Sequence, residues 1–108
     1  MRVFETTELL AEPVTGPTRY RELLHEASMS LGLCVLPAAS ADPHPPHAED
    51  EVYYVLKGRA QIMVDGKHHP VQPGSLIFVP RNADHAFHSI SEDLQLLVFF
   101  AQPQGGNR

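Results

Sequence analysis

Two short parts of this 108-residue chain carry side chains that could bind a metal ion. The first contains His44, His47 and Glu51, and the second contains His85. Imidazole nitrogens and a carboxylate oxygen are typical donors to a mononuclear transition-metal site, whose three or four ligands must converge from rigid elements. We therefore expect the two parts to meet in space, brought together by the elements around them.

The elements expected around these residues are β-strands. Short apolar runs alternate with Gly, Pro, Asn and Asp, and no stretch of four helical turns carries an apolar stripe. Eight strands are predicted, at residues 20–24, 30–36, 51–56, 60–64, 68–71, 75–79, 85–89 and 94–100. A short helix within residues 19–27 is the alternative to the first of them. Asp65-Gly66 predicts a two-residue hairpin turn and Pro73-Gly74 a second turn, so the fold class is all-β.

Alternation along residues 51–56 predicts where Glu51 points. A period of two places Glu51, Tyr53 and Val55 on one face of the strand. Burying a carboxylate in an apolar interior is costly unless a cation or hydrogen bonds compensate its charge. A metal ion would provide that compensation. Tyr53, on the same face, is a candidate proton donor or substrate-binding hydroxyl, or else a packing residue.

The same alternation separates the histidines of the 85–89 strand. His85 and Phe87 fall on one face and His88 on the other, so only one of the two histidines can share the interior with Glu51. We predict that it is His85. Strand phase also predicts the lining of a mostly apolar pocket: Tyr53, Phe78, Phe87, Leu96 and Val98.

The chain is predicted to be one domain with two flanking segments. Residues 1–18 are expected to form an extended arm, residues 19–101 the barrel, and residues 102–108 a disordered tail. Both faces of the 51–56 strand are largely apolar, which requires a second cover outside the barrel. The arm or a partner subunit could supply it, and a homodimer is therefore expected.

Composition and charge narrow the classes of function. The 13 acidic residues outnumber the 8 basic ones, so nucleic acid is not an expected partner. No charged amino-terminal segment precedes a long apolar run, so we expect no membrane association and a cytoplasmic location. Cys34 is the single cysteine, which excludes an internal disulfide, and its apolar neighbours predict a buried, inert thiol.

The histidine and glycine spacings resemble those of a small single-domain cupin with an RmlC-like jelly roll. The first cupin motif runs Gly, five residues, His-x-His, three or four residues, Glu, six residues, Gly; it is matched by His47, Glu51 and Gly58. The second runs Gly, five residues, Pro-x-Gly, two residues, His, three residues, Asn; it is matched by Gly74, Pro80 and His85. The resemblance covers about residues 31–100 and implies a double-stranded β-helix.

The chain departs from these motifs at four positions: Ala39 and Asn82 replace glycines, Ser89 replaces the closing Asn, and Pro45 replaces the first histidine. His44 lies one residue before Pro45. The Pro45-Pro46 pair favours polyproline II, whose three residues per turn would return His44 to the side of His47, about 9 Å away along the axis. His44 is thus a candidate fourth ligand, a residue that supports a ligand, or part of the mouth of the site.

The resemblance implies His47, Glu51 and His85 as core ligands of one divalent transition metal per chain: iron, manganese, nickel, cobalt or zinc. We expect the other histidines to be surface residues: His25, His68, His69 and His88. A small-molecule substrate or ligand is expected, and dioxygenase-like chemistry is favoured. An isomerase or lyase acting through a metal-stabilised enolate, and a non-catalytic cupin with a structural or ligand-binding metal, are the alternatives.

Overall fold

The computed structural model describes residues 1–11, 19–40 and 47–101, which form one short helix and six strands. Helix α1 spans Thr6–Ala11. The strands are β1 (Tyr20–His25), β2 (Met29–Leu36), β3 (Glu51–Val64), β4 (Lys67–Val71), β5 (Leu76–Val79) and β6 (His85–Ala101). The expected all-β fold class is confirmed, and the alternative helix within residues 19–27 is wrong.

The prediction of eight strands is wrong because two pairs of predicted strands are continuous. Residues 51–56 and 60–64 both belong to β3, and residues 85–89 and 94–100 both belong to β6. Glycine at position 58 has a positive φ of 98° and lies where the β3–β6 register shifts. Such bulges bend a strand without ending it, so each long strand turns the corner of the barrel.

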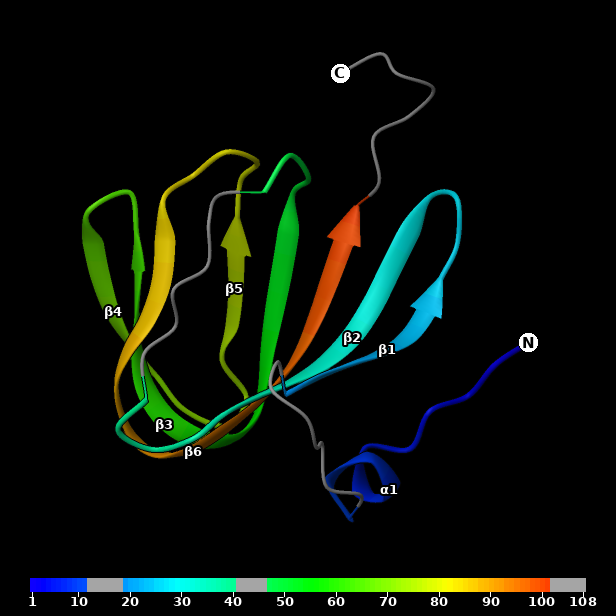
Figure 1. The fold of residues 1–108 in the computed structure, drawn as a ribbon, viewed down its shortest axis with the longest axis horizontal. Coiled ribbons are helices and arrows are strands. Elements are labelled where there is room, and N and C mark those ends of the chain that lie inside the picture. The colour runs from blue at the N-terminus through cyan, green and yellow to red at the C-terminus, as the bar shows by residue number, and fades with distance from the viewer. Residues whose placement is uncertain (12–18, 41–46, 102–108) are drawn as a thin grey trace.

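The strands form one curled antiparallel sheet in the order β1-β2-β6-β3-β4, with β5 paired to β3 (Figure 1). β3 pairs with β5 along residues 51–54 and with β4 along residues 60–64, while β6 runs along its other edge. β3 and β6 are therefore the central strands, and their paired ends Glu51↔Phe100 and Val64↔His85 lie far apart along the sheet. This is the double-stranded β-helix that the motifs predict.

The interior of the barrel is an apolar core built by alternating residues. Glu51, Tyr53 and Val55 are buried while Val52, Tyr54 and Leu56 between them are half-buried, so the predicted alternation of β3 is confirmed. The largest interior side chains of the core include Phe87, Leu94, Leu96, Val55 and Val79.

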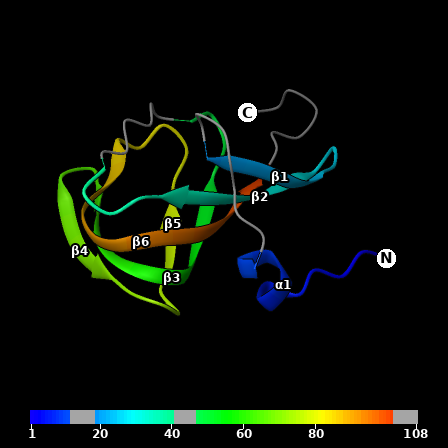
Figure 2. The same cartoon turned by 60° about the horizontal axis from the view of Figure 1, so that its bottom comes forward.

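The outer face of β2 and β6 is covered from within the chain. Leu9 of α1 is buried in a second apolar cluster with Leu31, Leu33 and Leu97. Figures 1 and 2 show α1 lying outside the barrel. The prediction that residues 1–18 form an extended arm is wrong for residues 6–11, because these residues form α1. Tyr54 and Leu56, on the outer face of β3, pack against the same cluster, so Leu9 contributes to the cover that this face required. Residues 102–108, the predicted disordered tail, lie outside the described residues.

Both predicted turns are confirmed. Asp65 (φ 48°) and Gly66 (φ 82°) have the two positive φ angles of a type I′ hairpin turn between β3 and β4. Gly74 (φ 95°) supplies the positive φ in the turn before β5. Of the described residues, α1 is the one helix, and it is too short to cross a membrane.

Three departures from the cupin motifs retain left-handed backbone. Ala39 (φ 62°), Asn82 (φ 63°) and Ser89 (φ 51°) have the positive φ that Gly or Asn adopts more easily. Asn tolerates this conformation well, whereas alanine does not. Ala39 is exposed, so its methyl group gains little packing in return.

Ala39→Gly should therefore stabilise the fold by about 0.5–1 kcal/mol, measured by urea denaturation. Ala38→Gly is the matched control, because Ala38 has no positive φ and should lose a similar amount of stability to backbone entropy. A destabilised Ala39→Gly variant would contradict the assigned strain.

Candidate metal centre

Three predicted ligands meet at one end of the barrel. Glu51 opens β3, His85 opens β6, and His47 lies in the segment before β3. His85 Nε2 lies 3.3 Å from Glu51 Oε2, and His47 Nε2 lies 3.8 Å from Glu51 Oε1. One donor atom from each residue lies within 4.8 Å of the others. This is a set of two imidazoles and one carboxylate, the donor set that the sequence predicts.

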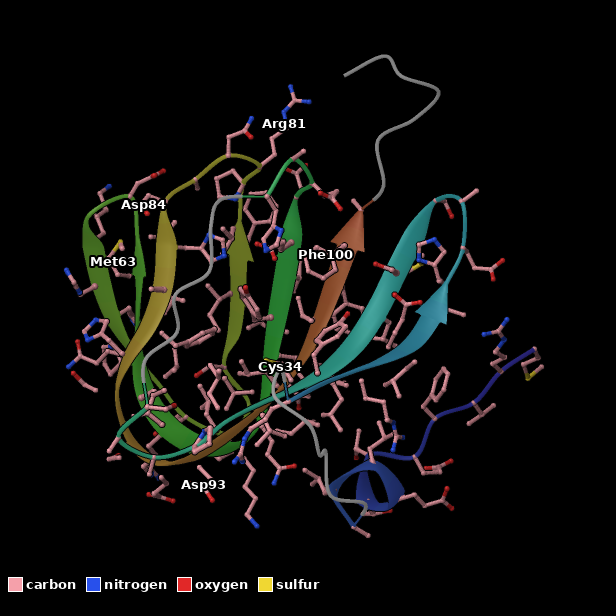
Figure 3. The ribbon with its side chains drawn as sticks, viewed as in Figure 1. Cys34, Met63, Arg81, Asp84, Asp93 and Phe100 are labelled. Carbon is pink, nitrogen blue, oxygen red and sulfur yellow. The ribbon has the colours of Figure 1, made fainter. Side chains whose placement is uncertain are left out.

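Hydrogen bonds from the loop between β5 and β6 hold the segment that carries His47. The backbone N–H of Asn82 donates to the His47 carbonyl (2.7 Å), and the backbone N–H of Arg81 donates to Asp50 Oδ1 (2.9 Å). The left-handed backbone of Asn82 turns the chain at this point. Figure 3 shows Arg81 at the edge of the barrel opposite to Asp93. The loop after β5 therefore fixes the segment that carries His47.

A backbone carbonyl orients the His85 ring. His85 Nδ1 lies 3.0 Å from the Ala83 carbonyl, which can only accept a hydrogen bond. Nδ1 therefore donates to this carbonyl, and Nε2 is left directed at Glu51. Metal-binding histidines are commonly fixed in this way by the ring nitrogen that does not bind the metal.

The electrostatics of Glu51 fit a bound cation. Its side chain is 1% exposed, and burial raises its pKa from 4.5 to about 7. The positive charge of His85 acts in the opposite direction and lowers this pKa, but burial is the larger effect. Among the described residues its ion-pair partners are the two histidines. Burial, together with the charge of His85, lowers the pKa of His47, which favours the neutral imidazole that binds metals. His47, Glu51 and His85 thus fit a divalent transition metal.

The hydroxyl of Tyr53 lies beside the same donor atoms. It is 3.4 Å from Glu51 Oε1, to which it donates, and 3.3 Å from His85 Nε2. The ring is 4% exposed and packs edge-on against Phe87 at 5.0 Å. Burial and the nearby Glu51 carboxylate raise the pKa of Tyr53, which keeps the hydroxyl protonated. Tyr53 is therefore a proton-bearing group at the centre.

A cavity of about 430 Å³ reaches the centre from solvent. Its walls are Tyr20, Glu22, His25, Ser30, Cys34, His47, Glu49, Tyr53, Val98 and Phe100. The predicted lining is correct for Tyr53 and Val98, while Phe87 and Leu96 are packed in the core. Phe78 is 61% exposed, so its predicted place in the pocket is wrong. Phe78 pairs with outward-facing Val52, and paired residues share a face of the sheet.

Sequence reasoning missed the contribution of β1 and Phe100. The His47 ring packs edge-on against Phe100 at 5.3 Å. On β1, Tyr20 lies where a side chain on Gly32 would collide with its ring. The glycine at position 32 was the one feature of the sequence that could have indicated the packing of Tyr20 against β2, because a glycine inside a strand often marks a close contact.

His44 lies outside the described residues, so its predicted role as a fourth ligand stays a prediction. The other histidines of the described residues fall outside the centre. His25, paired with Glu22 at 3.7 Å, is exposed, as are His68 and His69, and His88 is half-buried on the outer face. Cys34 is buried as predicted, and burial raises the pKa of its thiol to about 11.

The raised pKa of Glu51 predicts how the metal-free protein responds to pH. Because its pKa is raised on folding, the folded state binds more protons than the unfolded state between pH 4.5 and about 7. The stability of the metal-free protein should fall by about 1–3 kcal/mol as the pH rises through this range. Urea denaturation at pH 5 and pH 8 measures it.

Glu51→Gln is the control, because the amide does not titrate and this part of the pH dependence should disappear. An equal pH dependence in both proteins would contradict the assignment. Added metal should reverse the trend, because binding requires the deprotonated carboxylate.

Comparison with known proteins agrees with this geometry. The family model of the cupin domain matches residues 32–100. The chain belongs to the cupin family. A protein of Streptomyces coelicolor described as uncharacterized is 44% identical over 104 residues, which cover 96% of this cupin and 99% of that protein.

Two other relatives extend the comparison. The dimethylsulfoniopropionate lyase DddW of Ruegeria pomeroyi is 30% identical over 96 residues, 83% of this cupin but only 62% of the lyase. The cupin domain of Schizosaccharomyces pombe Cnp3 superposes with a TM-score of 0.78 at 18% identity, over 88% of this cupin and 72% of that chain. This structural likeness supports the fold alone.

Proposed function

We propose that this cupin is a metal-dependent enzyme of small-molecule metabolism, with one divalent transition metal held by His47, Glu51 and His85. The observation that supports this proposal most directly is the position of the Tyr53 hydroxyl, which lies 3.4 Å from Glu51 Oε1 and 3.3 Å from His85 Nε2. Tyr53 and His47 also line the same solvent-connected cavity. A proton-bearing hydroxyl, an open ligand set and a pocket are therefore present together. The substrate, the metal and the cytoplasmic location stay predictions.

The residues of the centre and of the cavity would have different roles in catalysis. Three ligands leave coordination positions free, and a bound metal would supply Lewis-acid polarisation of a substrate oxygen. The protonated Tyr53 hydroxyl would donate a hydrogen bond or a proton to a substrate in the cavity. Val98 and Phe100 would exclude water from the apolar wall of the cavity.

Proton-transfer chemistry, as in a lyase or isomerase, is the reaction class that this arrangement supports best. The protonated Tyr53 would donate to the oxygen of a developing enolate, and the similarity to a lyase, DddW, points the same way. Dioxygenase-like oxidation, favoured from the sequence, is the second candidate, because two histidines and one carboxylate form the ligand set of non-haem iron oxygenases. In the non-catalytic alternative, the metal would only order the barrel or help to bind a ligand.

Two assays on the same metal-loaded protein separate these classes. Iron, manganese, nickel and zinc forms would be incubated with dimethylsulfoniopropionate, with alkene formation as the readout. Oxygen uptake would be followed with catechol, β-diketone and thiol substrates. Alkene formation without oxygen uptake would support the lyase, and oxygen uptake with iron would support the dioxygenase. Silence in every assay, with strong thermal stabilisation by metal, would contradict the enzyme and favour the non-catalytic cupin.

Tyr53→Phe should lower kcat about 10²- to 10⁴-fold while leaving the metal content unchanged, because only the hydroxyl is lost. Tyr54→Phe is the matched control, since Tyr54 lies on the opposite face of β3 and should keep full activity. Steady-state kinetics and metal analysis measure both effects. An active Tyr53→Phe variant would contradict the assigned role of the hydroxyl.

A further inference from the structure

We propose a second transition-metal site on the outside of the barrel, formed by His68 of β4 and His88 of β6. His68 Nδ1 and His88 Nε2 lie 2.8 Å apart. The ring centroids are 4.9 Å apart with an interplanar angle of 81°, so the rings meet edge to face. This pair is separate from the candidate metal centre and has no part in the function proposed above.

The sheet register brings these two histidines together although they are twenty residues apart. β3 lies between β4 and β6. His68 pairs with Met63 on one side of β3, and His88 pairs with Gln61 on the other. Paired residues share a face, so both imidazoles rise from the outer surface and reach toward each other across β3.

The separation of the two nitrogens suits a shared ion. Zinc binds imidazole nitrogen at about 2.0–2.1 Å with tetrahedral angles, which places two such nitrogens about 3.3 Å apart. The observed 2.8 Å needs to widen by only about 0.5 Å, which a small rotation of the exposed His68 side chain would supply. Without an ion, the two nitrogens must share a hydrogen bond, with one ring as donor.

Ser89 supports the orientation of the His88 ring. Its Oγ lies 3.0 Å from His88 Nδ1, so the serine oxygen can accept the Nδ1 proton and leave the Nε2 lone pair facing His68. Ser89 itself has a left-handed backbone (φ 51°), which is unfavourable in a residue other than glycine. A hydrogen bond to the second ring nitrogen is the usual support of a metal-binding histidine.

The proposed site differs in character from the candidate metal centre. His85 faces the interior and His88 the exterior of the same strand. His68 is exposed, so water would complete the coordination and the ion would exchange with solvent. Imidazole donors with water suit zinc, copper(II) or nickel(II). We expect weaker binding here than at the buried centre.

Equilibrium dialysis against increasing free Zn²⁺, with metal counted by mass spectrometry, tests the proposal. The wild-type protein should bind one tight ion and then a second, weaker one. His68→Asn and His88→Asn should each lose the second ion and keep the first. His69→Asn is the matched control on the same strand, because His69 Nδ1 contacts the Pro70 carbonyl and should not contribute. Ser89→Ala should weaken the second ion about tenfold.

A wild-type protein that takes up a single ion under all conditions would overturn the proposal. So would a second ion that survives in both His68→Asn and His88→Asn, since it would then bind elsewhere. All four variants lie outside the interior core, so their folding can be verified by the same thermal transition as the wild type. Failure here leaves the buried centre untouched.

Discussion

His85→Ala and His47→Ala should each abolish tight metal binding. Each removes one imidazole from a three-residue ligand set whose donor atoms lie within 4.8 Å of one another. The loss should exceed the roughly 10- to 100-fold drop in affinity that follows removal of a hydrogen bond supporting a ligand. Protein purified without chelators or an affinity tag, then dialysed against metal-free buffer, would be assayed for metal by mass spectrometry. Glu51→Ala should lose the ion in the same way.

His88→Ala is the matched control, because its side chain lies on the same strand as His85 but on the outer face. It should keep about one tight ion per chain. His85 is buried and His47 is partly exposed, so a folded His47→Ala variant tests the centre even where His85→Ala fails to fold. Loss of the tight ion in His88→Ala with retention in His47→Ala would show that the proposed ligands are wrong.

Gly58→Ala should destabilise the fold by about 3–5 kcal/mol or prevent folding. Gly58 has a φ of 98°, and a Cβ there would overlap the Asp93 backbone carbonyl and approach Leu94 Cα at 2.8 Å. These are backbone atoms of β6 that cannot rotate away. The collision would fall where the register between β3 and β6 shifts. Urea denaturation at one pH measures the effect.

Gly74→Ala separates the collision from the cost of a positive φ. Gly74 has a similar φ of 95°, but nothing lies within 4 Å of the position of its Cβ. This variant should lose only about 1–2 kcal/mol, the price of left-handed backbone. Equal losses in both variants would mean that close packing of Gly58 against β6 contributes nothing.

Much of the candidate centre followed from short-range patterns. Alternation within one strand was sufficient to place Glu51 and His85 inside and His88 outside, because successive side chains of any strand point to opposite faces. Asp65-Gly66 was sufficient to predict a tight turn, because few residues other than glycine, asparagine and aspartate accept positive φ. Motif spacing added the expectation that His47 joins them.

Features that depend on pairing between distant strands were beyond these patterns. β3 and β6 are longer than predicted because each continues through the register shift at Gly58. The need for glycine at this position comes from the close approach of the Asp93 backbone, which the sequence does not show. Phe78 faces outward because β5 pairs with β3 in a register that sets it opposite Val52. Residues 6–11 became helical where Leu9 could cover the outer face of β2 and β6.

Sequence by itself therefore determined the β class, the turns, and the inward direction of Glu51 and His85, because these depend on residue type and on a period of two, while motif spacing indicated His47. Only the tertiary structure decided which side chains touch: Tyr53 on Glu51 and His85, Phe100 on His47, and His68 on His88. The physical reason is that register and bulges are set by the packing of whole strands. A shift of one residue in that register would turn each of these side chains to the other face.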